Sequence, residues 1–219
     1  MPFERDVIVA VDGPAGSGKS SVAKALAEAL SLRHVDTGAM YRALALKAIL
    51  EGVDVESAKE VGGLLPGTTI ELDGERVTLD GVDVSSRIRD EEVSSASSKV
   101  AQHQEVRRWM VERQRQIVNG GPGGAVVEGR DIGTVVLPHA DLKLYLTASE
   151  RERASRRSRQ AGISEQRALD DVRTRDARDT ERTVSPLRVA DDAVVLDTTS
   201  LSLPQVVEKI LSIVQERGS

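Results

Sequence analysis

The segment from Gly13 to Ser20 carries the clearest chemical signal in the sequence. It reads GPAGSGKS and fits the pattern G-x-x-x-x-G-K-[ST] at every position. Glycines let backbone N–H groups point inward at phosphate oxygens, and the helix expected after the loop directs its positive end at the same anion. Lys19 adds a mobile positive charge, and the Ser20 hydroxyl can ligate Mg²⁺. The spacing therefore predicts a loop that binds the phosphates of a nucleoside triphosphate.

Three classes of protein use such a loop, and the rest of the sequence helps to separate them. A GTPase would normally carry the guanine-reading pattern N-K-x-D, which this sequence lacks. A mechanical ATPase would normally be larger and carry an apolar strand that ends in an acid, of which Val126–Glu128 is a weak version. A small-molecule kinase needs a second anion site and a positively charged cover, because phosphoryl transfer is catalysed mostly by positioning and charge neutralisation.

The segment Asp36–Arg42, DTGAMYR, supplies candidates for the second anion site. Asp36 or Thr37 can cap the helix expected here, and Arg42 lies about one turn inside it. An N-cap followed by a solvated arginine would also explain this segment when it is taken alone.

The segment Glu128–Thr134, EGRDIGT, follows a short apolar run that is typical of a buried strand. Ligands of open α/β sheets bind beyond the carboxyl ends of the strands. Arg130 and Asp131 are therefore predicted to be functional residues, although an adjacent Arg–Asp pair on a loop is more often an exposed ion pair.

Residues 151–182 are the candidate cover. They contain ten arginines, no lysine and seven acidic residues, a net charge of +3 (10 − 7). The planar arginine fork suits phosphate oxygens, and the thin apolar stripe favours a helical lid that packs loosely and can move. Many of these arginines also fit a solvated helix pair with i,i+4 ion pairs. Arg175, Asp179 and Arg182 have a spacing that predicts one shared helical face.

The remaining pattern predicts an α/β fold with a mainly parallel sheet, because short apolar runs alternate with segments of helical periodicity. The expected strands are 7–11, 125–127, 142–146 and 193–196, and the expected helices are 20–30, 39–51, 93–118 and 205–216.

One stretch, Thr68–Val84, departs from this alternation. Apolar and polar residues alternate there, and Asp73–Gly74 and Asp80–Gly81 are turn signals, which predicts a small antiparallel β insert of about three strands. Residues 62–67 and 119–124 are expected to be linking loops.

Composition limits the possible partners. The formal net charge of -5 argues against general nucleic-acid binding, and the absence of cysteine excludes disulfides and cysteine–metal sites. No apolar run is long enough for a signal-peptide core or a membrane span. We therefore expect a soluble cytoplasmic protein, with no membrane partner and nothing to indicate more than a monomer.

Four segments together, VDGPAGSGKS, DTGAMYR, EGRDIGTVV and RDARDTERTVSPL, resemble the bacterial cytidylate kinase family of nucleoside monophosphate kinases. The resemblance runs from Val7 to the C-terminal helix. It implies a P-loop NTPase three-layer fold with a five-stranded parallel sheet. The implied domains are a core (1–63, 95–150 and 184–219), a monophosphate-binding insert (64–94) and an arginine-rich lid (151–183). The implied reaction transfers the γ-phosphoryl group of ATP to CMP or dCMP with Mg²⁺.

The resemblance also implies roles for individual residues. Lys19, Arg130 and Arg182 are the implied catalytic residues, and Ser20 is the implied Mg²⁺ ligand. The implied ATP-binding residues are Gly13, Pro14, Ala15, Gly16, Ser17, Gly18, Lys19, Ser20, Ser21 and Arg157. The implied acceptor-binding residues are Thr37, Arg42, Ser98, Arg107, Arg130, Asp131, Arg175, Asp179 and Arg182. Glu128 departs from the family pattern, in which many relatives have aspartate.

The chemistry of cytosine agrees with Ser98, Arg107 and Asp131 as the residues that read the base. A carboxylate accepts from the 4-amino group of cytosine but repels the carbonyl oxygen of uracil. Ser98 and Arg107 are nine residues apart (107 − 98), so they do not share a face of one unbroken helix. We expect that the helix begins after Ser98 or breaks near residues 101–104.

Three other functions remain open from the sequence. They are a kinase for another small acceptor, such as a different monophosphate or shikimate, a non-catalytic nucleotide-binding module that regulates a partner, and a nucleic-acid 5′-end kinase. The base-reading residues argue against another small acceptor, and the predicted lid argues against a non-catalytic module. The net charge of -5 argues against a nucleic-acid kinase.

Overall fold

The computed structural model describes residues 7–217, which form two compact units. The first unit contains the residues up to Val35 and those from Gly121 onward, and the second contains Asp36–Gly120. The predicted division into core, insert and lid remains a prediction, and residues 1–6 and 218–219 of the predicted core lie outside the described part. No helix within residues 7–217 combines the length and apolarity needed to cross a membrane.

A five-stranded sheet with the strand order β2-β6-β1-β7-β8 organises the first unit. Its strands are β1 (Ile8–Asp12), β2 (Arg33–Asp36), β6 (Ala125–Glu128), β7 (Leu142–Thr147) and β8 (Val194–Asp197). The pairs β1–β6, β1–β7 and β7–β8 are parallel, as the alternation of elements predicts. The carboxyl ends of β1 and β6 therefore lie at the same edge of the sheet.

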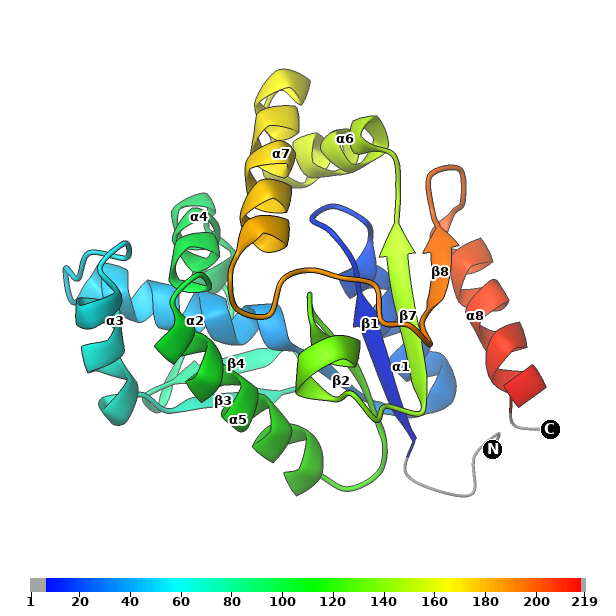
Figure 1. Cartoon of the computed structure of the whole chain (residues 1–219), viewed down its shortest axis with the longest axis horizontal. Helices are drawn as coiled ribbons and strands as arrows, with labels where there is room; N and C mark the ends of the chain where they lie inside the picture. The colour runs from blue at the N-terminus through cyan, green and yellow to red at the C-terminus, as the bar shows by residue number, and fades with distance from the viewer. Residues whose placement is uncertain (1–6, 218–219) are drawn as a thin grey trace. The chain divides into compact units, whose positions relative to one another are not determined.

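Two helices of the first unit, α1 (Lys19–Leu30) and α8 (Leu203–Arg217), cover one face of this sheet. In Figure 1, α8 lies beside β8. Their apolar residues recur at helical spacing and pack on alternate residues of β1 and β7, which forms one continuous core. This core includes Val9, Val11, Val22, Leu26, Leu144, Leu146, Val206 and Ile210.

The predicted lid segment is a pair of helices, α6 (Glu150–Ala161) and α7 (Glu165–Glu181). Ser149 and Ser164 cap their first turns, and Gly162 ends α6 in the left-handed conformation at φ 65°. Only two residues of each helix are buried, so their apolar contact is thin, as predicted. Figure 1 shows α6 following the carboxyl end of β7.

The second unit contains the predicted β insert. Strands β3 (Ile70–Asp73), β4 (Arg76–Leu79) and β5 (Val82–Asp83) form an antiparallel sheet. Around it lie α2 (Thr37–Leu50), α3 (Ala58–Leu64), α4 (Glu91–Val100), α5 (Gln104–Gly120) and the short 3₁₀ helices η1 (Leu65–Gly67) and η2 (Arg87–Arg89). Trp109 of α5 is partly buried against this core.

Two sequence-based expectations for the second unit require comment. The single helix predicted over 93–118 is two helices, with a break at residues 101–103, which is one of the two solutions that the Ser98–Arg107 spacing required. The predicted linker 62–67 is wrong, because α3 and η1 occupy it. Ser57 caps α3, and Val61 and Leu64 are buried.

Candidate active site

The phosphate loop joins the carboxyl end of β1 to the first turn of α1. Two of its glycines are required by space as well as by conformation. A Cβ on Gly13 would lie 2.0 Å from the Leu146 carbonyl oxygen, and one on Gly16, at φ 75°, would lie 2.8 Å from the Arg153 carbonyl oxygen. The loop therefore rests directly on β7 and α6, and its backbone remains available to an anion.

Lys19 lies within this loop and is 6% exposed. Its Nζ donates to the Pro14 carbonyl oxygen at 2.8 Å. Burial, reinforced by the nearby Arg130 cation, lowers the pKa of Lys19 to about 7. A bound phosphate would stabilise the ammonium form, so this lysine is suited to an anionic ligand.

Ser20 and Glu128 place two kinds of oxygen beside the loop. Ser20 Oγ donates to Glu128 Oε2 at 2.7 Å, and the other carboxylate oxygen lies 3.0 Å from His34 Nε2. A hydroxyl and a carboxylate fit Mg²⁺, which takes oxygen ligands and usually relies on one or two protein groups plus substrate phosphates. Residues 7–217 contain no cluster of three or more His, Cys, Asp or Glu residues that could hold a metal ion.

Asp12, at the end of β1, fixes the loop after β6. Its two carboxylate oxygens accept from the backbone N–H of Ile132 at 2.8 Å and of Gly133 at 2.7 Å. Burial raises the pKa of Asp12 to about 6, although the two amide hydrogen bonds oppose this shift. These bonds set the start of a short π-helix, η3 (Ile132–Val136), and thereby the position of Asp131.

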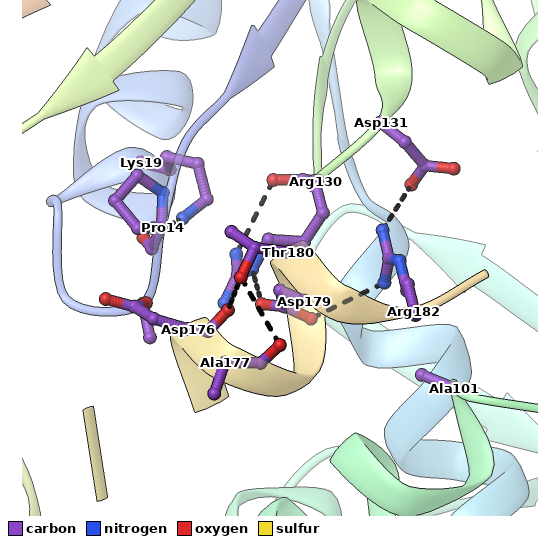
Figure 2. A network of polar contacts seen from close by, with 12 residues as sticks. Pro14, Lys19, Ala101, Arg130, Asp131, Asp176, Ala177, Asp179, Thr180 and Arg182 are labelled. Atoms are coloured by element: carbon purple, nitrogen blue, oxygen red, sulfur yellow. Dashed lines mark hydrogen bonds and ion pairs between the residues drawn. The ribbon is translucent and has the colours of Figure 1, made fainter. Parts of the chain in front are cut away.

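Arg130, Asp179 and Arg182 form a charged network (Figure 2). Arg130 Nε donates to Asp179 Oδ2 at 2.7 Å, and Arg182 Nη1 donates to Asp179 Oδ1 at 3.4 Å. Arg182 Nη2 also lies 3.7 Å from Asp131 Oδ1. Burial alone would lower the pKa of Arg130, but the Asp179 carboxylate outweighs this effect and raises it. The network joins the loop after β6 to α7.

The predicted shared face of Arg175, Asp179 and Arg182 is only partly correct. Helix α7 ends at Glu181, and Arg182 has extended backbone angles, so it lies just beyond the helix. It reaches Asp179 from that position. Arg175 lies 3.5 Å from Asp171 on the same helix, and burial, with the nearby Arg157 cation, lowers the pKa of Arg175.

The arginines of α6 connect this helix to the phosphate loop through polar contacts. Arg153 Nη1 donates to the Ala15 carbonyl oxygen at 3.1 Å, and Arg156 Nη1 donates to the Ser17 carbonyl oxygen at 3.3 Å. Arg157, for which the family resemblance implies contact with ATP, pairs with Asp171 of α7 at 3.1 Å. Arg153 and Arg156 are therefore the lid arginines that contact the phosphate loop.

A cavity of about 360 Å³ opens beside the loop, within the first unit. Its size is in the range of small-ligand pockets. Residues of the phosphate loop, α1, α6, α8 and the segment after β8 line it. These are Ser17, Gly18, Ser21, Val22, Glu152, Arg156, Arg159, Thr198, Leu201, Leu203 and Val206.

The second unit carries the other candidate residues. Asp36 caps α2 by accepting from the Ala39 N–H at 3.0 Å, and Arg42 pairs with the same carboxylate at 2.6 Å, so the arginine is held rather than simply solvated. Arg107, 2% exposed, donates to the Ala101 carbonyl oxygen at 3.3 Å and lies over the Tyr41 ring at 5.6 Å. Thr37 is the first, buried residue of α2.

The structure thus gathers the phosphate loop, Arg130, Asp131, Asp179 and Arg182 in one unit, and it places Thr37, Arg42, Ser98 and Arg107 in the other. Sequence reasoning did not find Asp12, His34, Tyr41 or the cavity-lining residues. Their contacts join segments far apart in the chain, and only the placement of Asp12 at the end of a predicted strand gave any signal.

A phosphate loop on a parallel sheet, an arginine-rich helix pair and a small-ligand cavity beside them define an ATP-dependent small-molecule kinase of the P-loop fold. Comparison with known families makes this assignment specific. Residues 9–216 match the family described as cytidylate kinase. The chain belongs to the cytidylate kinase family.

Individual relatives agree with this assignment. The cytidylate kinase of Anoxybacillus flavithermus is 48% identical over 98% of this chain and 99% of its own length. That of Bacillus subtilis is 45% identical over 99% of this chain and 100% of its own length. Among solved structures, a gluconokinase from Sinorhizobium meliloti 1021 is 16% identical, covers 97% of this chain and 94% of its own chain, and has a TM-score of 0.50. That likeness concerns the fold alone.

Proposed function

We propose that this chain transfers the γ-phosphoryl group of ATP to CMP and dCMP, which yields ADP and CDP or dCDP. The observation that carries the proposal is the proximity of two cationic sites. Lys19 of the phosphate loop follows β1 and Arg130 follows β6, and these neighbouring strands run parallel, so both cations lie beyond the same edge of the sheet. Two adjacent cationic centres suit a reaction between two phosphate groups, whose mutual repulsion must be neutralised.

On the donor side, the backbone of residues 13–18 and Lys19 hold the triphosphate, and the cavity beside Arg156 receives the nucleoside. Ser20 and Glu128 hold Mg²⁺, directly or through water. The metal neutralises charge on the donor phosphates when it is bound. Arg157 remains a predicted ATP contact, to be made when the pair with Asp171 rearranges.

On the acceptor side, Arg42, Arg130 and Arg182 bind the monophosphate, and Arg175 and Asp179 bind the sugar. Asp131 accepts from the 4-amino group of cytosine, while Ser98 and Arg107 donate to the base and Thr37 lines the same site. The hydrogen bond from the Ile132 N–H to the Asp12 carboxylate supports this role of Asp131, because it fixes the backbone one residue further along the chain. A misplaced carboxylate could not discriminate between cytosine and uracil.

The reaction requires no general base. The attacking group is a phosphate with a second pKa of about 6, so it is largely an anion at neutral pH. Lys19, Arg130 and Arg182 neutralise charge around the transferring group, and the lid helices exclude water. A cytoplasmic location and a monomeric state remain predictions.

The test is ADP release from ATP–Mg²⁺ with CMP, dCMP, UMP, AMP and GMP offered one at a time. We expect strong turnover with CMP and dCMP, weak turnover with UMP and none with the purines. A preference for UMP or AMP would contradict the roles of Ser98, Arg107 and Asp131. An absence of acceptor-dependent release would contradict the proposed reaction.

A further inference from the structure

His34 has no role in the nucleotide sites described above, but it contacts Glu128, which faces Ser20 beside the phosphate loop. We propose that His34 is a positioning residue, which orients the Glu128 carboxylate so that one of its oxygens faces Ser20 and the metal. The inference rests on the proposed function only in that it requires a metal–nucleotide complex at the phosphate loop. It does not depend on which acceptor the enzyme uses.

The two oxygens of the Glu128 carboxylate contact different residues. Glu128 Oε2 accepts from Ser20 Oγ at 2.7 Å, and Oε1 lies 3.0 Å from His34 Nε2. Because an ionised carboxylate only accepts hydrogen bonds, the His34 Nε2 carries the proton in this contact. The two contacts fix both oxygens, and therefore the rotation of the carboxylate plane.

Burial makes this arrangement energetically important. The side chain of Glu128 is 4% exposed and that of His34 is 18% exposed. A buried carboxylate oxygen that loses its donor suffers the full cost of desolvation, so the group would turn toward another donor. Without His34, such a turn would move the oxygen that faces Ser20.

The length of the side chain explains why such support is needed. Glutamate has one more rotatable bond than aspartate between the backbone and the carboxylate, so its oxygens reach further but are less confined. His34 lies on β2, next to β6 in the sheet, and both strands are fixed by backbone pairing. His34 therefore restricts the rotation of the Glu128 carboxylate, as the hydrogen-bond partners of metal-facing groups commonly do.

The experiment measures metal binding rather than turnover. Mn²⁺ would be titrated into the full chain with a saturating, non-hydrolysable ATP analogue, and free Mn²⁺ followed by electron paramagnetic resonance. We expect His34→Ala to weaken Mn²⁺ binding about tenfold. His34→Gln, whose amide can donate from a similar position, should recover most of the loss. The exposed His139 provides the matched control, and His139→Ala should change nothing.

Two further measurements separate positioning from a general structural role. Affinity for the analogue without metal should be the same in His34→Ala as in the parent chain. In a Glu128→Asp background, whose shorter arm cannot keep both contacts, His34→Ala should have less than a threefold effect. Unchanged Mn²⁺ affinity in His34→Ala would overturn the proposal. So would equal losses with and without metal, or equal effects of His34→Ala in both backgrounds. If His34→Ala does not fold, the Mn²⁺ affinity of His34→Gln is measured instead, in the parent chain and in the Glu128→Asp background. The same criteria then apply to the effect of His34→Gln.

Discussion

Replacement of Asp12 by asparagine tests whether a buried, charged carboxylate supports the loop that carries Arg130 and Asp131. Asp12 is 5% exposed, and its pKa is raised from 3.8 to about 6. A raised pKa means that the folded chain holds a proton which the unfolded chain has already released. Stability from this group is therefore fully present below pH 3.8 and is lost as the pH rises through 6.

The size of the effect follows from the shift. A difference of 2.2 pH units (6 − 3.8) corresponds to about 3 kcal/mol of unfolding free energy, of which about half is lost between pH 5 and pH 8. Asparagine does not ionise, so Asp12→Asn lacks this dependence. Between pH 5 and pH 8, the free energy of unfolding of the parent chain should therefore fall by about 1.5 kcal/mol relative to that of the variant.

The assay is denaturant unfolding followed by far-ultraviolet circular dichroism at several pH values. Asp73→Asn, at an exposed carboxylate of β3, is the matched control and should show a constant difference from the parent chain. A constant difference for Asp12→Asn, or a relative gain in parent stability with rising pH, would refute the reasoning. The same variant should raise the KM for CMP, because an amide can accept from only one of the two backbone N–H groups and donates toward the other.

Three further variants test the phosphate loop and its surroundings. Lys19→Ala should lower turnover at least about 100-fold, because it removes the cation that stabilises the donor phosphates. The unfolding midpoint should stay the same. Near-normal turnover would show that the loop does not bind the donor. Gly16→Ala should lower the free energy of unfolding by about 1–3 kcal/mol, because φ is 75° and the new Cβ would lie 2.8 Å from the Arg153 carbonyl oxygen; equal stability in denaturant unfolding would contradict the close packing. Arg156→Ala should raise the KM for ATP about tenfold and leave the KM for CMP unchanged in initial-rate measurements; a matching rise for CMP would contradict its assignment to the donor side.

Local signals in the sequence were sufficient for much of the fold. The β insert follows from period-two alternation and from Asp–Gly turns, and Asp80 and Gly81 do adopt positive φ. The phosphate loop follows from its glycines and from the apolar strand before it. Both depend on residues close together in the chain, which is where sequence patterns are informative.

Elements held by tertiary contacts were not predictable in this way. Strand β2 buries only Val35, so it has no alternating pattern. Helix α3 contains Gly62 and Gly63, which read as a linker, yet a Cβ on Gly62 would lie 2.7 Å from the Glu105 carboxylate. Close packing of α3 against α5 thus overrides low helix propensity.

The candidate site likewise contains residues that local sequence patterns predict and residues that only tertiary contacts bring together. The positions of Arg130 and Asp131 follow from the rule that ligands bind at the carboxyl ends of strands. The roles of Asp12 and His34 depend on the order of strands in the sheet, which brings residue 12 to residue 132 and residue 34 to residue 128. No local pattern contains that order.

The single tryptophan of the chain, Trp109, has a practical consequence for all such measurements. It belongs to α5 in the second unit and has the Arg113 guanidinium over its ring at 5.4 Å. Intrinsic tryptophan fluorescence therefore reports on the surroundings of α5 in the second unit, whereas circular dichroism records the helices and strands of both units. A mismatch between the two signals during unfolding would directly reveal that the halves melt separately.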